Sequence, residues 1–230
     1  MSVDLLTKRA SFIRANEVLR RLRPEDAEKL ARSSDVVRLP RRSAVWMPGQ
    51  TDERVYLVRS GVVKVHQTLD GGRELTLGFY AKGDLLGEEA LLVGGPRTTR
   101  ADAYLPSELY ALPVAELRTY EDQLGSGLAR MVSSRRARME RRLGVLLFKN
   151  AHARLASLLL ELADEFGVRD SRGTIVNLKL THKELAGLIG ATRETVSFAI
   201  VDLRREGMVL TEGKRVVLLE PARLRALVGA

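Results

Sequence analysis

The chain has 230 residues, of which 45% are hydrophobic and 29% charged, as is typical of a soluble globular protein with one or two domains. It contains no cysteine, which excludes disulfides, thiolate metal sites and cysteine-held iron–sulfur clusters, and no apolar run of about 18 residues predicts a membrane helix. The net charge of +9 favours a polyanionic partner, nucleic acid first and a membrane surface second.

The N-terminal segment is predicted to be helical. Residues 5–32 carry a helical pattern, and Pro24 is expected to start a second short helix. Charged residues occur almost from the start, and the segment lacks the apolar core of a signal peptide. We therefore expect a cytoplasmic protein.

A β-rich region follows, from Val36 to about Pro113. Its short runs of alternating apolar residues are broken at Gly61, Gly71–Gly72 and Gly83, which predicts hairpins at these glycines. Several short strands at such spacing indicate a sandwich or barrel, with a jelly roll as the natural candidate.

A single long helix without proline is predicted from about Glu121 to Asn150. Apolar residues recur along it at spacings of three, four and seven, as a surface facing a second helix would require. They are Leu124, Leu128, Val132, Met139, Leu143, Leu146 and Leu147. Residues 151–230 then alternate short helices with a final hairpin. The predicted organisation is a sensor domain at 1–120, a dimerisation helix at 121–150 and a third domain at 151–230.

Two closely spaced helix starts mark this third domain. Thr181 followed by Glu184 is a capping box, and Gly190 permits a sharp turn after the helix that it opens. Thr192 is a second N-cap, and its helix is expected to end at Gly207. A helix, a glycine turn and a second helix form the helix-turn-helix pattern, whose second helix reads base edges in the DNA major groove.

The second helix is predicted to point polar residues outward at its start. Arg193 suits guanine, Glu194 suits cytosine, and Phe198 could touch a thymine methyl group. Lys214 and Arg215 follow a glycine turn, as in the wing of a winged helix. The remaining candidate DNA contacts, mostly to phosphate, are Thr181, His182, Lys183, Thr192, Thr195 and Ser197. The alternatives are a helical hairpin with a solvated polar end and, for His182, an exposed residue beside the cap.

Five stretches of the chain resemble the CRP–FNR family of bacterial transcription regulators. The DNA motif of that family is similar to "LTHKELAGLIGATRETVSFAIVDLRREGMV", and other family segments resemble, in order, "VYLVRSGVVKV", "GDLLGEEALL", "PRTTRADA" and "ARLASLLLEL". The resemblance implies an α+β protein with an N-terminal cyclic-nucleotide-binding β jelly roll, a long dimerisation helix and a C-terminal winged helix-turn-helix domain.

The stretch "GDLLGEEALLVGGPRTTRA" resembles the phosphate-binding cassette of this family. Gly87 allows a close backbone approach, and the amides of Glu88, Glu89 and Ala90 would open a short helix that attracts an anion. Arg97 can pair with a cyclic phosphate and Thr98 can donate a hydroxyl to it. The resemblance implies that Glu88 accepts the ribose 2′-hydroxyl. The alternatives are an internal ion pair between Arg97 and Glu88, or a pocket for another ligand.

Three positions depart from the cyclic-AMP receptor protein branch of the family. Members of that branch read TGTGA-like half-sites and carry a second base-reading arginine where Phe198 stands, so one base should be read less strictly. Met139 and Glu140 occupy the positions of two adenine-contacting hydroxyl residues. Glu140 could accept from an adenine amino group or face solvent, and Arg135 could reach the phosphate or a neighbouring carboxylate. Cyclic AMP is the favoured effector.

The function predicted from the sequence is DNA-binding regulation of transcription by a homodimer, activated by a cyclic nucleotide. The expected partners are double-stranded DNA with palindromic TGTGA-like half-sites, a second copy of the chain and RNA polymerase. The alternative is a constitutive or other-effector regulator with an unused nucleotide pocket. No catalytic or metal site is predicted, because the three histidines lie in unrelated contexts and no cysteine is present.

Overall fold

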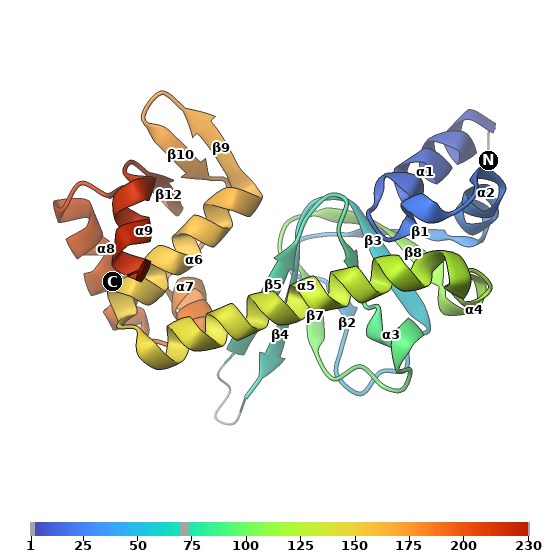
Figure 1. The fold of residues 1–230 in the computed structure, drawn as a ribbon, viewed down its shortest axis with the longest axis horizontal. Helices are drawn as coiled ribbons and strands as arrows, with labels where there is room; N and C mark the ends of the chain where they lie inside the picture. The colour runs from blue at the N-terminus through green and yellow to red at the C-terminus, as the bar shows by residue number, and fades with distance from the viewer. Residues whose placement is uncertain (1–2, 70–73, 230) are drawn as a thin grey trace. The chain divides into compact units, whose positions relative to one another are not determined.

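The computed structural model describes residues 3–69 and 74–229, and the chain divides into two units (Figure 1). The first unit contains Met1–Thr68 and Thr76–Arg135, and the second contains Leu69–Leu75 and Arg136–Ala230. The division falls inside one helix, α5 (Glu121–Phe148). The domain bounds expected from the sequence, which assign this helix to a segment of its own, stay a prediction.

The N-terminal segment is helical, as predicted, with α1 (Val3–Ala15) and α2 (Pro24–Ser33) joined through a short 3₁₀ turn, η1 (Leu19–Arg21). Pro24 starts α2, where its missing N–H costs nothing. The buried Arg9 of α1 donates from Nη1 to the carbonyl oxygens of Ala31 and Ser34, at 3.1 and 2.8 Å. These bonds satisfy acceptors that the end of α2 leaves without helical partners.

Two four-stranded sheets form the β region, which confirms the predicted sandwich. The first sheet has the order β1-β8-β3-β6 and the second β2-β7-β4-β5. The strands of the first sheet are β1 (Asp35–Leu39), β8 (Ser107–Pro113), β3 (Arg54–Ser60) and β6 (Leu85–Leu86). Those of the second are β2 (Ala44–Trp46), β7 (Arg100–Ala103), β4 (Val63–Thr68) and β5 (Glu74–Tyr80). Two short helices, α3 (Glu89–Leu92) and α4 (Val114–Arg118), complete the unit up to α5.

The chain changes sheet at two of the glycines where hairpins were predicted. Gly61, at φ 86°, leads from β3 in the first sheet to β4 in the second, and Gly83, at φ 94°, leads back from β5 to β6. A hairpin prediction at these two positions is therefore wrong. Period-2 alternation suits a corner between packed sheets as well as a hairpin, so the sequence does not separate them. The predicted turn at Gly71–Gly72 lies outside the described residues.

The first sheet is covered on both faces. Along β3, Val55 and Leu57 pack with the helices, whereas Tyr56 and Val58 pack between the two sheets. Successive side chains of a strand point to opposite faces, so one strand contributes to both cores. Figure 1 shows α1, α2 and the start of α5 on one side of this sheet. The unit thus has three layers: helices, first sheet, second sheet.

The apolar residues of α5 do not form one continuous exposed stripe. Leu124 and Leu128 are 1% and 6% exposed and belong to the core between the helices and the first sheet. Their assignment to a partner-facing surface is therefore wrong, because the N-terminal part of α5 covers its own sheet. Farther along, Val132, Met139, Leu143 and Leu147 are between 41% and 72% exposed.

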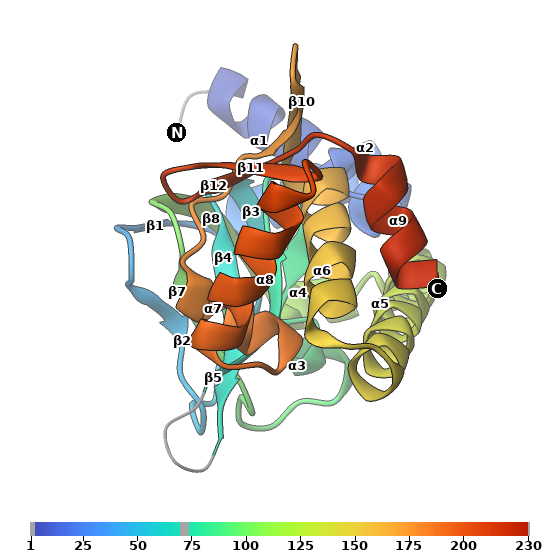
Figure 2. The ribbon, with the colours of Figure 1, turned by 90° about the vertical axis from the view of Figure 1, so that its left-hand side faces the viewer.

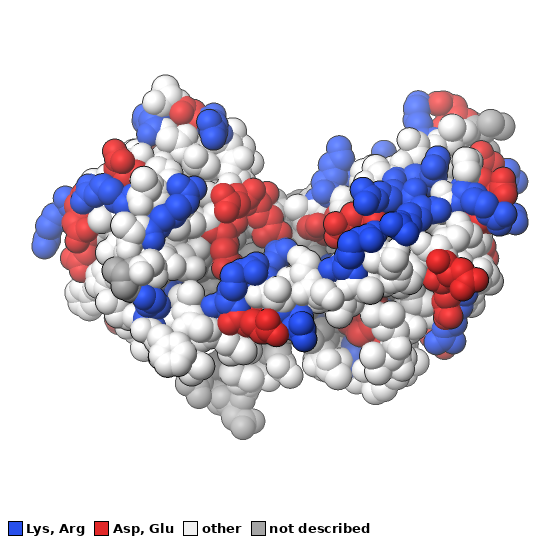
Figure 3. Space-filling model, viewed as in Figure 1, with Lys and Arg blue, Asp and Glu red and all other residues white. Residues whose placement is uncertain are grey.

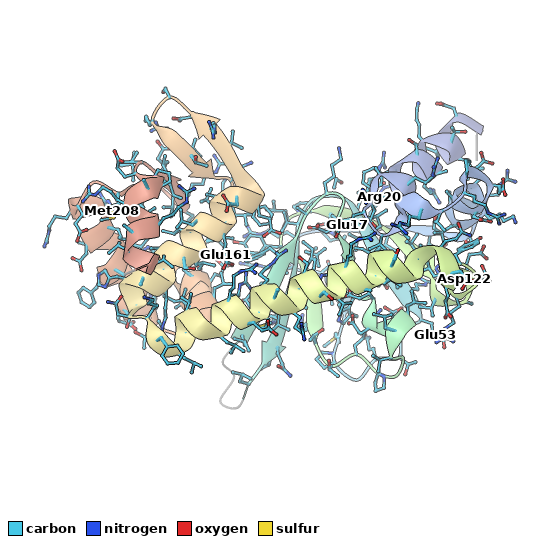
Figure 4. All side chains as sticks on the ribbon, viewed as in Figure 1. Glu17, Arg20, Glu53, Asp122, Glu161 and Met208 are labelled. Carbon is cyan, nitrogen blue, oxygen red and sulfur yellow. The ribbon has the colours of Figure 1, made fainter. Side chains whose placement is uncertain are left out.

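The second unit is built on α6 (Ala151–Phe166), which packs against α9 (Pro221–Gly229), α7 (His182–Ile189) and α8 (Arg193–Arg205). A hairpin of β9 (Gly167–Asp170) and β10 (Gly173–Val176), which the sequence reading missed, joins β11 (Val209–Glu212) and β12 (Arg215–Leu218) in a sheet of order β11-β12-β10-β9. The predicted final hairpin is β11–β12, but α9 follows it. Figure 4 labels Glu161 on α6, which accepts a hydrogen bond from Arg142 of α5 at 2.9–3.0 Å.

A close approach of α5 to the N-terminal segment gives a test of this packing. A Cβ added at Gly127 would lie 2.9 Å from Cα of Val18 and 3.1 Å from its carbonyl oxygen, both backbone atoms. Gly127→Ala should therefore destabilise the first unit by about 1–3 kcal/mol, although alanine is normally the better helix residue. The measurement is urea unfolding followed by the fluorescence of Trp46, the single tryptophan.

The matched control is Gly125→Ala, two residues earlier, where an added carbon meets nothing within 4 Å. This variant should be as stable as the wild type or up to about 1 kcal/mol more stable. Equal unfolding midpoints for the two variants would contradict the packing of α5 on Val18.

Candidate functional site

The predicted helix starts in the second unit are confirmed. Helix α7 (His182–Ile189) begins at a complete capping box, in which Thr181 Oγ1 accepts from the Glu184 amide at 3.2 Å and the Glu184 carboxylate accepts from the Thr181 amide at 2.7 Å. Gly190 ends α7 in the left-handed region, at φ 60° and ψ 42°. Few residues other than glycine adopt this conformation without strain, so the turn between the helices is fixed locally.

Helix α8 (Arg193–Arg205) begins at Thr192, whose Oγ1 accepts from the Thr195 amide at 3.1 Å. One face of α8 is buried, through Val196, Ile200 and Leu203. The opposite face exposes Glu194 and Phe198, the latter with 71% of its surface accessible, and Arg193 is exposed at the first residue of the helix. Figure 2 looks onto this unit and shows α8 lying across α7, with the β11–β12 hairpin beside it.

The Ser197 hydroxyl is engaged by neighbours within the unit. It donates to the carbonyl oxygen of Arg193 at 2.9 Å and lies 2.8 Å from Nδ1 of His182. A serine hydroxyl has one hydrogen, so Nδ1 must be the donor in the second bond. His182 therefore connects the start of α7 to the first turn of α8. The hydroxyls of Thr192 and Thr195 also bond to each other, at 2.9 Å.

A cavity of about 450 Å³ lies where α7, α8 and the β11–β12 hairpin meet. Its described lining includes cationic and polar side chains and no carboxylate. The polar members are Thr181, His182, Lys183, Arg193, Thr211, Lys214 and Arg215. We call this cavity the cationic groove. It brings the predicted wing residues and the start of the predicted reading helix into one concave surface.

The β11–β12 hairpin, which forms one wall of the cationic groove, is fixed by a contact from the neighbouring β9–β10 hairpin. Its turn is at Gly213, with φ 60°. Arg172, in the turn between β9 and β10, binds Glu212 of the hairpin and Asp170 of its own turn. The pKa of Asp170 is lowered by the hydrogen bonds from Arg172. The sequence reading missed Arg172, because nothing local indicates that the two hairpins share a sheet.

The first unit brings together the predicted cassette. Gly87, at φ 80°, lies directly over the guanidinium of Arg97, and an added Cβ would come 3.0 Å from Nη1. The side chain of Arg97 is 1% exposed. It donates from Nη1 to the Gly87 carbonyl oxygen at 2.9 Å and from Nη2 to that of Arg54, and its Cζ lies 4.5 Å from the ring centre of Trp46.

Two carboxylates also hold Arg97. Asp52 Oδ2 lies 3.1 Å from Nη2, and Glu89 Oε1 lies 3.2 Å from Nη1. Asp52 also accepts from the hydroxyl of Tyr56 at 2.9 Å. Burial of Tyr56, together with the nearby Asp52 carboxylate, raises the pKa of its phenol well above the ordinary value. Within the described chain, Nε of Arg97 is a buried donor with no hydrogen-bond partner.

Glu88 pairs with α5 and not with Arg97, so the predicted alternative of a direct Arg97–Glu88 pair is wrong. Arg135 of α5 binds the Glu88 carboxylate and the Leu85 carbonyl oxygen, and its Cζ lies 5.1 Å from the ring centre of Tyr80. Burial lowers the pKa of Arg135, but its interactions with Glu88, Tyr80 and Asp84 together raise the pKa by more, so the net shift is upward. Glu88 is the neighbouring carboxylate that the sequence offered as one target of Arg135.

The three other predicted ligand contacts are Ala90, Thr98 and Glu140, and each has a different environment. The amide of Ala90 donates to the Gly87 carbonyl oxygen at 3.1 Å, so it is not free for an anion as expected. Thr98 is exposed. Glu140 is 62% exposed and lies 3.5 Å from Arg136 one turn earlier in α5.

The structure also bears on membrane-spanning helices and metal-binding clusters. Among residues 3–69 and 74–229, no helix combines the length and apolar character needed to cross a membrane. That part of the chain also shows no cluster of three His, Asp or Glu side chains suited to a metal ion.

A β-sandwich with a glycine–arginine cassette and a separate winged helix-turn-helix together define a sensor-linked DNA-binding protein. Residues 36–123 match the cyclic nucleotide-binding domain, and residues 153–227 match the Crp-like helix-turn-helix domain. The chain belongs to the CRP–FNR family of bacterial transcription regulators. It is a DNA-binding transcription regulator with a cyclic nucleotide-binding domain, and not an enzyme.

Named relatives cover nearly the whole chain. A CRP-like cAMP-activated global transcriptional regulator of Mycobacterium tuberculosis is 31% identical over 204 residues, covering 87% of this chain and 91% of that protein. The cyclic AMP receptor protein of Thermus thermophilus is 33% identical over 210 residues, covering 90% and 94%. The crystal structure of another CRP-family regulator from Thermus thermophilus aligns with a TM-score of 0.73 at 31% identity, covering 84% and 97%.

Effectors differ among similar structures. The c-di-GMP-responsive global regulator of Xanthomonas campestris aligns with a TM-score of 0.73 at 26% identity, covering 85% of this chain and 99% of that one. Family membership therefore gives a cyclic nucleotide-binding domain without naming its ligand.

Proposed function

We propose that a homodimer of this chain binds a palindromic DNA site and that a cyclic nucleotide, cyclic AMP in first place, raises its affinity for that site. The observation that carries the DNA part is the cationic groove beside the exposed start of α8. The proposed parts are a sensor domain at 1–120, a dimerisation helix at 121–150 and a DNA-binding domain at 151–230. The regulator would act in the cytoplasm, with RNA polymerase as a further partner.

In this proposal α8 enters the major groove with its N-terminal turn first. Arg193 would donate to guanine O6 and N7, and Glu194 would accept from cytosine N4. Both side chains are exposed beside a buried face that fixes the helix. The phosphate backbone would lie along the cationic groove, within reach of Lys183, Lys214 and Arg215 and of the Thr181, Thr192 and Thr195 hydroxyls. Arg215 lines the groove, so its guanidinium can add a contact there.

The dimer would form along α5. Among the large apolar side chains that α5 exposes in the protomer, four recur at spacings of seven, four and four: Val132, Met139, Leu143 and Leu147. Helices pair through such a seam, and a two-fold protein matches a two-fold operator with half-sites about 34 Å apart. Figure 3 shows Lys and Arg side chains over α5 with acidic ones among them, and we interpret this as a solvated charged surface.

The nucleotide would bind at the cassette. The residue types suit a cyclic phosphate and a ribose, and the buried Nε of Arg97 supplies a donor that lacks a partner. When bound, the nucleotide would supply an anionic phosphodiester and a 2′-hydroxyl. Arg97 and Thr98 would hold the phosphate, with the Glu88 and Glu89 amides, and Glu88 would accept the hydroxyl. Arg135 and Glu140 stay candidate contacts from α5.

One observation favours the second candidate, a regulator with another effector or none. Both terminal nitrogens of Arg97 are already held by carboxylates and carbonyl oxygens. Those contacts stabilise the domain whether or not a nucleotide is present. A DNA affinity that is the same with and without nucleotide would select this candidate.

Arg193 gives the test of the DNA proposal. Arg193→Ala should weaken operator binding by about 1–3 kcal/mol and relax one base position, because it removes a bidentate base contact. Binding-site selection from a random library, followed by affinity measurement on single-base variants, reads out both effects.

Lys214→Ala is the matched control, because it removes a proposed phosphate contact from the wing. It should weaken all sequences alike and reduce the slope of log affinity against log salt by about 1. If Arg193→Ala and Lys214→Ala behave identically on all sequences, α8 does not read bases through Arg193.

Phe198 should read a thymine by its methyl group. Replacing one thymine of the half-site by uracil removes only that methyl, which should cost the wild type about 0.8 kcal/mol, roughly fourfold in affinity. Phe198→Ala should bind the thymine and uracil operators equally. A uracil scan of every thymine position in both proteins is the measurement, and an equal uracil effect in both proteins would contradict the contact.

The nucleotide part is tested by operator affinity in titrations of cyclic AMP and cyclic GMP. Coupling of about 1–3 kcal/mol should raise operator affinity by roughly 5- to 150-fold, and operator DNA must tighten the nucleotide by the same factor. The linear 5′-AMP, which lacks the cyclic phosphodiester, is the ligand control. Flat titrations with both cyclic nucleotides would overturn the nucleotide part and leave the DNA part standing.

A further inference from the structure

The guanidinium of Arg97 has little hydrogen-bonding capacity left. An arginine carries five N–H donors, two on each terminal nitrogen and one on Nε. Nη1 meets the Gly87 carbonyl oxygen and Glu89, and Nη2 meets the Arg54 carbonyl oxygen and Asp52. Only Nε remains without a partner within the described chain. An arriving phosphodiester therefore gains a two-point contact only by displacing one of these acceptors.

The charges around the cassette are not those of an empty anion site. Two cations, Arg97 and Arg135, meet three carboxylates, those of Asp52, Glu88 and Glu89. These five side chains together carry one net negative charge before a cyclic nucleotide brings another. Like charges brought together in a partly desolvated site oppose binding.

The two carboxylates on Arg97 differ in how firmly they are held. Asp52 is 18% exposed and also accepts from Tyr56, so it is anchored at two points. Glu89 is 43% exposed, and Arg97 is the partner that the structure gives its carboxylate. It is also the first residue of α3, the short helix that begins two residues after Gly87. Glu89 is therefore the acceptor that a ligand can displace at the lower cost.

We propose that the Glu89 carboxylate occupies the place of the ligand phosphate on Arg97 and thereby sets the nucleotide affinity of this regulator. This inference rests on the proposed function, because it concerns the same cassette. A cyclic nucleotide binds by exchanging its phosphodiester for Glu89 at Nη1, while Asp52 keeps Nη2 in place. The wild-type site therefore responds only to a high concentration of nucleotide. The Glu89 carboxylate sets the nucleotide concentration at which the site is half-occupied.

The test compares full-length wild type with Glu89→Gln by calorimetric titration with cyclic AMP. Removing the competing charge should tighten cyclic AMP about tenfold. Glu89→Ala should give a similar gain, and Glu89→Asp, which keeps the charge, should give a smaller one. Glu17→Gln is the matched control, since it makes the same charge change at an exposed residue near Arg20 (Figure 4) and should leave nucleotide affinity unchanged.

Trp46 provides a second readout that does not depend on DNA. It is the only tryptophan, and the Arg97 cation lies over its ring. Exchange of Glu89 for a phosphodiester changes the charge beside the indole, so nucleotide should shift Trp46 emission at lower concentrations in Glu89→Gln than in wild type.

The outcomes separate this inference from the proposed function. Wild-type binding with no gain in Glu89→Gln and Glu89→Ala overturns the role of Glu89 and leaves nucleotide gating intact. Binding that appears in Glu89→Gln but is weak or undetectable in wild type supports the role of Glu89. If no variant and no wild type binds, both the nucleotide part of the proposed function and the role of Glu89 are overturned, and operator binding is unaffected.

Discussion

The burial of the first sheet on both faces is the constraint on which the first unit depends. Strands β3 and β8 alternate between the helical layer and the sandwich interior, so neither core can change without moving the other. The cassette adjoins this sheet: β6 pairs with β3 at Leu86 and Leu85, and Gly87 follows immediately. The position of Arg97 under Gly87 is thus fixed by the packing of the whole unit. A close-packed interior transmits small displacements instead of absorbing them.

The sequence predicted the elements whose signals are local. Thr181 with Glu184, Thr192 and Gly190 carry their structural reasons within a few residues, and each behaves as expected. The corner at Gly61 could not be predicted, because its neighbours in space, Pro106 and Ser107, lie far along the chain. The burial of Leu124 and Leu128 was missed for the same reason: helical spacing shows that a face is apolar but not what covers it.

The same limit applies to the candidate site. Gly87, Glu88 and Arg97 are close in sequence and were found together, whereas Asp52 and Trp46 reach Arg97 from the segment before β3. No periodicity or motif connects them to the cassette. The residues that determine how an arginine binds an anion can therefore lie far from it in sequence, even where a local motif identifies the arginine. Ser197 shows the same effect in the second unit, since its partner His182 lies on another helix.

Charge is distributed differently in the two units, and the two sites therefore suit different kinds of anionic ligand. The described lining of the cationic groove contains basic side chains and no carboxylate, which suits a partner with a dense and permanent negative charge. At the cassette the arginines are matched or exceeded by carboxylates, which suits a ligand that must be released as well as bound. Arg135, the last residue of the first unit, pairs with Glu88, so in the proposed function a nucleotide that engages Glu88 would also affect this residue of α5. Such a ligand shifts the equilibrium between DNA-binding and non-binding arrangements only by its difference in affinity for the two. The excess carboxylate at the cassette opposes an anionic ligand, so the proposed sensor would gain its response from that difference and not from tight binding.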